Sequence, residues 1–295
     1  MKKIIKKVSF RIIRKVHNIK LRNLLCSILK LFLPKKEMFY GNNILELKNS
    51  EEVIFQDLKN NGFSDLGIVL NDTMINKILI KLKDLKCYDL DKKDNLIVDL
   101  NNVDNSTQLA NYLREDLVQI SEILQIANDS RILNAVTNYL GIKPTISNIN
   151  CWWSFGDRQE AKEAQFFHRD LDDYKFVKIF FYLTDVNIKN GPHIFIKGSH
   201  KLNKLIQLRR FEDSEVNDNF DSKNILTLTG SKGSSFIEDT YGIHKGQLPL
   251  EGKRLLLQIQ YSYLPLHVEE YSPQRIENQD KYVFDNYINR LIIKE

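Results

Sequence analysis

From Thr145 onward, the sequence is a succession of short apolar runs that end at Gly, Pro, Asn or Asp, with no stretch of helical periodicity between them. Runs of this kind, separated by turn residues, are typical of β-strands. A chain with many short strands and no intervening helices folds as a sandwich or jelly roll, not as a parallel sheet with crossover helices. The predicted strands cover residues 145–153, 176–183, 193–196, 225–228, 234–237 and 255–263.

The preceding hundred residues have a different pattern of apolar and polar residues, which predicts mostly helices. Helix-start and helix-stop residues indicate a helix from Ser50 to about Gly62 and a helical block over 108–140 that ends at Gly141. A strand over 63–70 and a second helix beginning near Asn71 lie between them. The fold class expected is therefore mostly β with N-terminal helices (α+β), a double-stranded β-helix of the jelly-roll or cupin type flanked by helices. Residues 211–224 form the longest predicted loop, expected to be a solvated connection, with a mobile lid as the alternative.

The first 36 residues differ in charge from the rest of the chain. They contain twelve of the 43 Lys and Arg and no Asp or Glu, so residues 37–295 carry 31 basic and 38 acidic side chains, a net charge of −7. Apolar residues recur among the basic ones at near-helical spacing, which predicts a basic amphipathic helix that binds a membrane surface or a partner. A helix packed on the body of the protein is the alternative. These apolar residues are Ile4, Ile5, Val8, Ile12, Ile13, Val16 and Ile19.

Two further features concern the surroundings of the protein. The acidic body argues against nucleic acid as a partner. Cys26, Cys87 and Cys151 are isolated, odd in number and without metal-type spacing, which favours a reducing compartment. We therefore expect a cytoplasmic protein, with peripheral contact at the membrane surface through residues 1–36.

The most informative side chains are His168 and Asp170, together with the distant His244. In an extended segment, residues two apart point to the same face, so His168 and Asp170 lie together and Arg169 points away. A strand-and-turn segment places His244 where it can join them. Two imidazoles and one carboxylate on one face of a metal, with open positions opposite, are the ligands of mononuclear Fe(II) oxygenases.

Arg254 supplies a fourth element of the predicted site. A dicarboxylate co-substrate that chelates iron at one end needs a fixed cation for its other carboxylate, and Arg offers two parallel donors. Gly246, Pro249 and Gly252 imply a turn between His244 and Arg254, which predicts that the two lie on adjacent strands. Because Leu255 to Leu257 follow Arg254, it begins a core strand and points inward.

The order of these motifs resembles the phytanoyl-CoA dioxygenase-like branch of the Fe(II)/2-oxoglutarate oxygenases over about residues 53–262. Asn61, Gly62 and Phe63 are similar to the family's opening segment, and residues 126–144, IANDSRILNAVTNYLGIKP, to its helix and turn. Phe167 to Asp172 resembles the strand that carries the iron ligands. Residues 190–201, NGPHIFIKGSHK, are the most specific local match, although Lys197 replaces the usual Pro.

The resemblance implies Fe(II), 2-oxoglutarate and O2 as cofactor and co-substrates. It implies that His168, Asp170 and His244 hold the metal and that Arg254 binds the far carboxylate of 2-oxoglutarate. Phe180 matches a position where an aromatic residue lines the pocket, and Tyr182 shares its strand parity. A single oxygenase domain would span 37–295, with largely helical support over 37–144, a jelly-roll core over 145–265 and a C-terminal extension over 266–295.

The expected reaction is hydroxylation of an unactivated C–H bond, because related halogenases have a small residue where Asp170 stands. The substrate class left open is a small molecule, a lipid or a glycan-linked metabolite. Two other readings of the fold remain: a non-catalytic jelly-roll binding module, and a cupin-type metalloenzyme that does not use 2-oxoglutarate and would not require Arg254.

Overall fold

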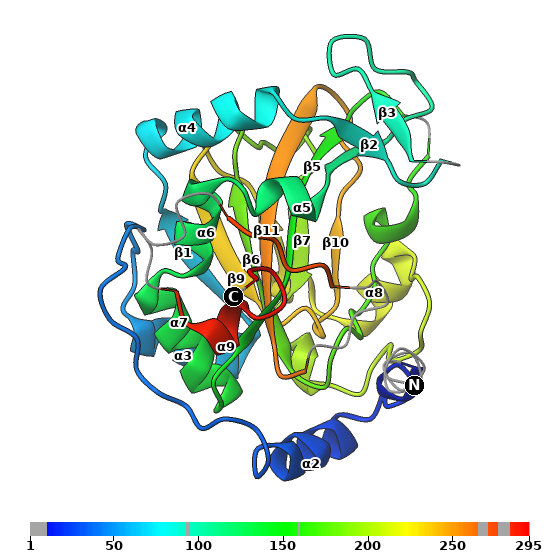
Figure 1. Ribbon diagram of the computed structural model, residues 1–295. Helices are drawn as coiled ribbons and strands as arrows, with labels where there is room; N and C mark the ends of the chain where they lie inside the picture. The colour runs from blue at the N-terminus through cyan, green and yellow to red at the C-terminus, as the bar shows by residue number, and fades with distance from the viewer. Residues whose placement is uncertain (1–10, 93–94, 159, 265–270, 277–283, 295) are drawn as a thin grey trace.

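The computed structural model describes residues 11–92, 95–158, 160–264, 271–276 and 284–294 (Figure 1). Its strands form two antiparallel sheets, and the larger has the order β1-β9-β6-β11-β5-β4-β2-β3. These are β1 (Phe63–Ile68), β9 (Ser234–Glu238), β6 (Phe176–Tyr182), β11 (Lys253–Ser262), β5 (Thr145–Phe155), β4 (Leu109–Tyr112), β2 (Cys87–Asp89) and β3 (Leu96–Val98). The smaller sheet has the order β10-β7-β8, with β10 (His244–Gly246), β7 (His193–Ile196) and β8 (Ile225–Leu228). The mostly antiparallel β fold predicted from the sequence is confirmed, without a closed barrel among the described residues.

The two faces of the larger sheet have different roles. On β6, Val177, Ile179 and Phe181 belong to the main hydrophobic core, whereas Lys178 and Phe180 line a cavity on the opposite face. The same alternation runs along β5 and β11, as expected when successive strand residues point to opposite sides. The core therefore lies between the larger sheet and the helices, and the cavity lies toward the smaller sheet.

Helices cover the outer face of the larger sheet. They are α3 (Glu51–Asn61), α4 (Asp72–Lys83), α5 (Arg114–Leu117), α6 (Ser121–Ala127), α7 (Ser130–Leu140) and α9 (Asn286–Asn289). The predicted ends are confirmed: Ser50 caps α3 through its side chain, and Gly62 ends that helix with a φ of 73°. Gly141 ends α7 in the same left-handed conformation, which glycine adopts without steric cost.

Two local predictions are wrong. The helical block expected from residue 108 begins as strand β4, which alternates half-buried and buried residues beside β5 and so has the period of a strand. Residues 211–224 are not a plain loop, because α8 (Asp213–Asn219) lies within them. Glu212 and Glu215 form a reciprocal capping box that starts α8, a signal without apolar periodicity.

The described part of the basic N-terminal segment contains α2 (Ile19–Leu29), which starts at the Asn18 cap and packs on the body. Arg22 on its inner side donates to the backbone oxygens of Asp173 and Tyr174, and Cys26 is buried beside it. The apolar positions Ile4, Ile5 and Val8 lie outside the described residues. None of the helices within the described ranges has the length and apolar character needed to cross a membrane.

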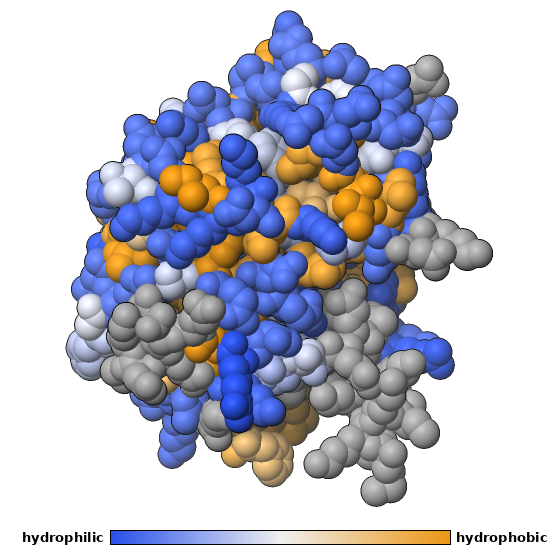
Figure 2. Space-filling model, turned by 45° about the horizontal axis from the view of Figure 1, so that its top comes forward, coloured by the Kyte–Doolittle hydropathy of each residue, from blue (hydrophilic) through white to orange (hydrophobic). Residues whose placement is uncertain are grey.

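Figure 2 shows the molecule with the top of Figure 1 turned forward. Hydrophilic residues cover most of this face, and apolar residues gather in separate patches among them. A surface of this kind is ordinary for a globular domain.

Candidate active site

Two short segments, distant in the sequence, bring the predicted metal ligands together. His168 pairs with His244 in an isolated antiparallel bridge, and Asp170 donates its backbone N–H to the carbonyl of Thr240 at 3.0 Å. His244 is also the first residue of β10 in the smaller sheet. The segment that carries His168 and Asp170 is therefore held in an extended conformation against the strand that carries the third ligand.

The three side chains converge on one point. His168 Nε2 lies 3.5 Å from Asp170 Oδ1, and His244 Nε2 lies 3.4 Å from Asp170 Oδ2. One ligand atom from each residue lies within 4.8 Å of the others. Both histidines are buried. This is the group of residues that the sequence predicted.

Backbone carbonyls fix the orientation of both imidazole rings. His168 Nδ1 lies 2.9 Å from the carbonyl of Phe166, and His244 Nδ1 lies 2.9 Å from that of Gly242. In the neutral rings Nδ1 carries the hydrogen that these carbonyls accept, so each Nε2 directs a lone pair at the carboxylate. Two lone pairs and a carboxylate that face one another require a cation between them. The donor set therefore fits a divalent metal such as Fe(II).

The pKa values of the three residues reflect this convergence. Burial, aided by His244, lowers the pKa of His168 to about 4. Burial also lowers the pKa of His244, but the Asp170 carboxylate outweighs it, so that pKa is raised overall. Burial alone would raise the pKa of Asp170, yet Lys178 and His244 hold it well below its usual range. Asp170 is thus ionised, as a metal ligand must be.

Lys178, on the cavity side of β6, is a buried neighbour of this group. Its Nζ lies 2.6 Å from Asp170 Oδ2 and 2.9 Å from Asp172 Oδ2. Burial lowers the pKa of Lys178, but the two carboxylates more than reverse this and raise it overall. The ammonium therefore stays charged and fixes the orientation of the Asp170 carboxylate.

Arg254 lies on β11 with its guanidinium buried and directed into the same cavity. It donates to the carbonyl of Gly191 and, at 3.2 Å, to Ser154 Oγ, while its Nε has no hydrogen-bond partner. Among the described residues, no carboxylate lies within ion-pair distance of Arg254. A buried cation without a carboxylate is costly unless a ligand supplies the anion.

The strands of Arg254 and His244 face each other rather than lying side by side. The prediction of adjacent strands is wrong, because β11 belongs to the larger sheet and β10 to the smaller one. A Cβ added to Gly246, two residues after His244, would lie 3.5 Å from an Arg254 guanidinium nitrogen. Arg254 therefore reaches across the space between the sheets to the end of β10.

The cavity between the sheets has a volume of about 200 Å³ and contains all four predicted polar residues. Trp152, Phe180 and Leu256 form its apolar wall. Trp153, the neighbour of Trp152, faces the main core. Tyr182 is buried behind this wall, where its hydroxyl donates to the carbonyl of Leu228 and accepts from His193 N–H. Phe180 therefore lines the cavity, whereas Tyr182 hydrogen-bonds to backbone groups behind the cavity wall.

His193 on β7 lines the cavity and has a buried partner, Glu238 on β9, that was not expected from the sequence. His193 Nε2 lies 2.9 Å from Glu238 Oε2, and the His193 ring stacks on His244 with 5.5 Å between ring centroids. Burial raises the pKa of Glu238 to about 8 and lowers that of His193 well below its usual range, so the two are a neutral hydrogen-bonded pair. The one sequence signal for Glu238 was its position two residues after Phe236 in the same strand, which places both side chains on one face.

Arg169 points away from the metal ligands, as predicted. Its guanidinium donates to the carbonyls of a single loop and of Tyr241, and no carboxylate pairs with it among the described residues. It therefore joins the ligand segment to the loop over 199–205. Neither ring nitrogen of His200, which lies in this loop, has a hydrogen-bond partner of ordinary geometry within the described ranges.

The chain is similar to known proteins in both sequence and structure. Residues 68–247 match the phytanoyl-CoA dioxygenase (PhyH) family. No curated protein sequence matches the chain. The structure of EctD from S. alaskensis with bound Fe is similar with a TM-score of 0.56 and 13% identity, over 89% of this chain and 93% of that one.

Two enzymes of nogalamycin biosynthesis are also similar in structure. The non-heme α-ketoglutarate-dependent carbocyclase SnoK matches with a TM-score of 0.54 and 12% identity, over 72% of this chain and 85% of that one. The epimerase SnoN, in complex with Fe3+, α-ketoglutarate and nogalamycin RO, matches with a TM-score of 0.50 and 14% identity, over 72% and 82% of the two chains. At such identities these likenesses establish a shared fold.

Proposed function

The chain belongs to the phytanoyl-CoA dioxygenase (PhyH) family, and on that premise we propose that it is a non-haem Fe(II)- and 2-oxoglutarate-dependent oxygenase. The proposal rests above all on the convergence of His168, Asp170 and His244 at one buried point. Bound there, iron would supply the activation of O2 that no amino-acid side chain provides, coupled to conversion of 2-oxoglutarate to succinate and CO2.

Each residue of the site has a separate task in this proposal. His168, Asp170 and His244 hold the metal, with their orientation fixed by backbone carbonyls and by Lys178. Arg254 binds the far carboxylate of 2-oxoglutarate, and this carboxylate supplies the counter-charge that Arg254 otherwise lacks. Phe180 excludes water from the cavity wall, and Tyr182 supports that wall from behind. Residues 37–295 would then work as one oxygenase domain.

For the reaction type, we propose hydroxylation of an unactivated C–H bond. Asp170 fills the position at which a halide would otherwise need room, and the cavity of about 200 Å³ holds the co-substrate and the reacting end of a substrate. The substrate class is a small molecule, a lipid or a glycan-linked metabolite. Trp152, Phe180 and Leu256 favour an apolar reacting carbon.

We also propose peripheral contact with an anionic membrane surface through the N-terminal segment. The side of α2 that faces away from the body, with the turn after it, exposes a continuous set of large apolar side chains. These are Leu21, Leu24, Ile28, Leu31 and Phe32, which are 45%, 56%, 46%, 79% and 80% exposed. Basic residues flank them on the same segment. An apolar face with basic borders matches an interfacial helix.

The decisive experiment for the enzyme is succinate formation. Protein purified without oxygen, supplied with Fe(II), 2-oxoglutarate and O2, is expected to release succinate slowly even without its substrate. The His168→Ala and Arg254→Met variants should release none above background. A binding module would give no succinate with any variant, and a metalloenzyme independent of 2-oxoglutarate would bind iron without consuming the co-substrate.

A further inference from the structure

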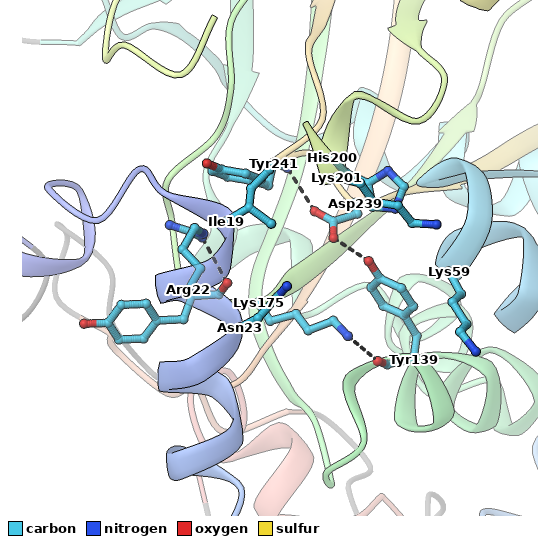
Figure 3. A pocket seen from close by; sticks show the side chains of 11 residues that line it. Ile19, Arg22, Asn23, Lys59, Tyr139, Lys175, His200, Lys201, Asp239 and Tyr241 are labelled. Carbon is cyan, nitrogen blue, oxygen red and sulfur yellow. Dashed lines mark hydrogen bonds between the residues drawn. The ribbon is translucent and has the colours of Figure 1, made fainter. Parts of the chain in front are cut away.

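A second cavity lies between α2 and the body, with no residue in common with the candidate active site (Figure 3). Its volume is about 240 Å³. Ile19, Arg22 and Asn23 of α2 form one side, and Tyr139 at the end of α7 lies on the other. Asp239 and Tyr241 complete the wall, so only a few residues separate this cavity from His244.

The segments around Gly62 and Gly198, both similar to motifs of the family, meet in this wall. The N–H of Gly198 donates to the carbonyl of Asn61 at 2.7 Å, and Lys201 Nζ donates to the carbonyl of Asn60 at 3.1 Å. A Cβ added to Gly62 would lie 2.5 Å from His200 Nδ1, so the imidazole packs directly on the glycine. The candidate active site uses neither His200 nor Lys201.

The cavity has a strong excess of positive charge. Arg22, Lys59, Lys175 and Lys201 line it against one carboxylate, that of Asp239. Asp239 already accepts hydrogen bonds from the Tyr139 hydroxyl and the Tyr241 N–H. Within the described ranges, none of the four cations is within ion-pair distance of a carboxylate. Like charges gathered without counter-charges repel one another, and an anionic ligand would relieve that repulsion.

Contacts of the individual cations show which donors are free for a ligand. Arg22 is occupied by backbone carbonyls and by the Tyr241 ring, 4.2 Å from its guanidinium carbon, so it supplies charge rather than hydrogen bonds. Lys175 donates to the carbonyl of Tyr139 at 2.6 Å and keeps further N–H donors. Lys59 and Lys201 are exposed, and Lys201 Nζ keeps N–H donors beyond the one that the carbonyl of Asn60 accepts.

His200 is the second, independent sign of a ligand. Its side chain is 8% exposed and lines the cavity, yet neither ring nitrogen has a hydrogen-bond partner of ordinary geometry among the described residues, and the backbone of Lys59 makes only a weak polar contact with the ring. Burial lowers the pKa of His200, which keeps the ring neutral, with one N–H donor and one acceptor. Buried polar atoms nearly always have partners, so an unpaired imidazole at a cationic cavity indicates that a bound group completes it.

We propose that this second cavity binds a phosphate group, with Lys59, Lys175, Lys201 and His200 as its donors. A phosphate presents several oxygens and up to two negative charges, which suits several ammonium groups around one neutral imidazole better than a single carboxylate would. The cavity volume holds a phosphate with a small ester group. Its source is either a soluble phosphate ester or the headgroup of a membrane lipid, since the outward side of α2 is the exposed apolar one.

The test compares two variants of the full-length protein that lose the same charge. Lys59→Gln/Lys201→Gln removes two donors from the cavity, and Lys197→Gln/Lys223→Gln removes two exposed lysines outside it. Binding of inorganic phosphate and glycerol 3-phosphate is measured by calorimetry. Sedimentation with phosphatidylcholine vesicles, with and without phosphatidic acid, forms the lipid arm. We expect the cavity variant to bind at least about tenfold more weakly than wild type and the control variant to bind as wild type does.

The two arms identify the source, and a third measurement locates the bound group. Weaker binding of the cavity variant to the soluble phosphates assigns a phosphate ester as the ligand. Weaker binding of that variant to the vesicles alone assigns a lipid headgroup. The ring signals of His200, identified with His200→Asn in NMR spectra, should shift on titration with phosphate. Equal binding by the cavity and control variants in both arms, or unshifted His200 signals, would overturn the proposal. Since no step uses enzyme activity, this outcome is independent of the proposed oxygenase function.

Discussion

His168 and His244 exchange a pair of backbone hydrogen bonds, 2.9 Å from His168 N to His244 O and 3.0 Å from His244 N to His168 O. Two residues 76 positions apart in the sequence are thereby held as direct cross-strand neighbours, with 4.3 Å between ring centroids. Both imidazoles must then face the same side of the bridge. Main-chain geometry thus fixes the candidate metal ligands in place without a metal, which would reduce the conformational entropy lost on binding one.

Arg254 is expected to determine the affinity for 2-oxoglutarate. Arg254→Met should weaken 2-oxoglutarate binding by roughly 100-fold or more, because the ligand's far carboxylate loses a charge-assisted pair of donors. Arg254→Lys should keep the charge but lose the fork geometry, with an intermediate loss. Calorimetry on the Fe(II)-loaded protein without oxygen measures both. Wild-type affinity in Arg254→Met would show that the co-substrate binds elsewhere.

His193 and Glu238 should behave as one unit in folding. His193→Leu leaves a buried carboxyl group without its partner and is expected to cost about 1–3 kcal/mol of unfolding free energy. The double variant His193→Leu/Glu238→Leu should cost less than the sum of the two single changes, because it leaves no unpaired polar group. Urea unfolding of the four proteins completes the cycle. Strictly additive effects would mean that the hydrogen bond contributes nothing.

Asp173 gives a pH dependence with a defined sign. Burial raises the pKa of this carboxyl group to about 7. The folded protein therefore holds the proton where the unfolded chain has released it, so its contribution to stability is complete below about pH 4 and is lost as the pH rises through 7. Asp173→Asn should gain stability relative to wild type over that interval, by a few kcal/mol at most. Parallel stability curves for the two proteins between about pH 4 and 8 would contradict the buried, protonated state.

Membrane contact should depend on the outward side of α2 and not on exposed apolar residues in general. Leu24→Gln/Ile28→Gln is expected to reduce sedimentation with anionic vesicles severalfold without lowering stability, since both side chains are exposed. Ile80→Gln/Ile97→Gln, which changes exposed apolar residues on α4 and β3, is the matched control. Equal partitioning of both variants and wild type would remove the membrane proposal.

Sequence patterns predicted the parts of this structure that depend on local rules. The His-x-Asp spacing of His168 and Asp170 follows from strand parity, and Gly62 and Gly141 mark helix ends because few other residues adopt their φ angles. The fold class and the inward direction of Arg254 followed from the succession of short apolar strands.

What the sequence did not predict depends on contacts between distant segments. Glu238 and His193 come from different sheets, and no short motif contains both. Strand β4 is specified by its pairing with β5, since its four residues are too few for a clear period. The charge of Lys178 is decided by Asp170 and Asp172, which only the folded chain brings within 3 Å of it.

The most direct test of the metal site is iron content at equilibrium with Fe(II), measured without oxygen and with 2-oxoglutarate present. The account predicts one tightly bound Fe(II) per wild-type chain, none in Asp170→Ala, and one in Asp172→Ala, which removes a nearby carboxylate that does not join the triad. A wild-type protein that binds no iron, or an Asp170→Ala variant that binds it as tightly, would contradict the assignment of His168, Asp170 and His244 as the metal ligands.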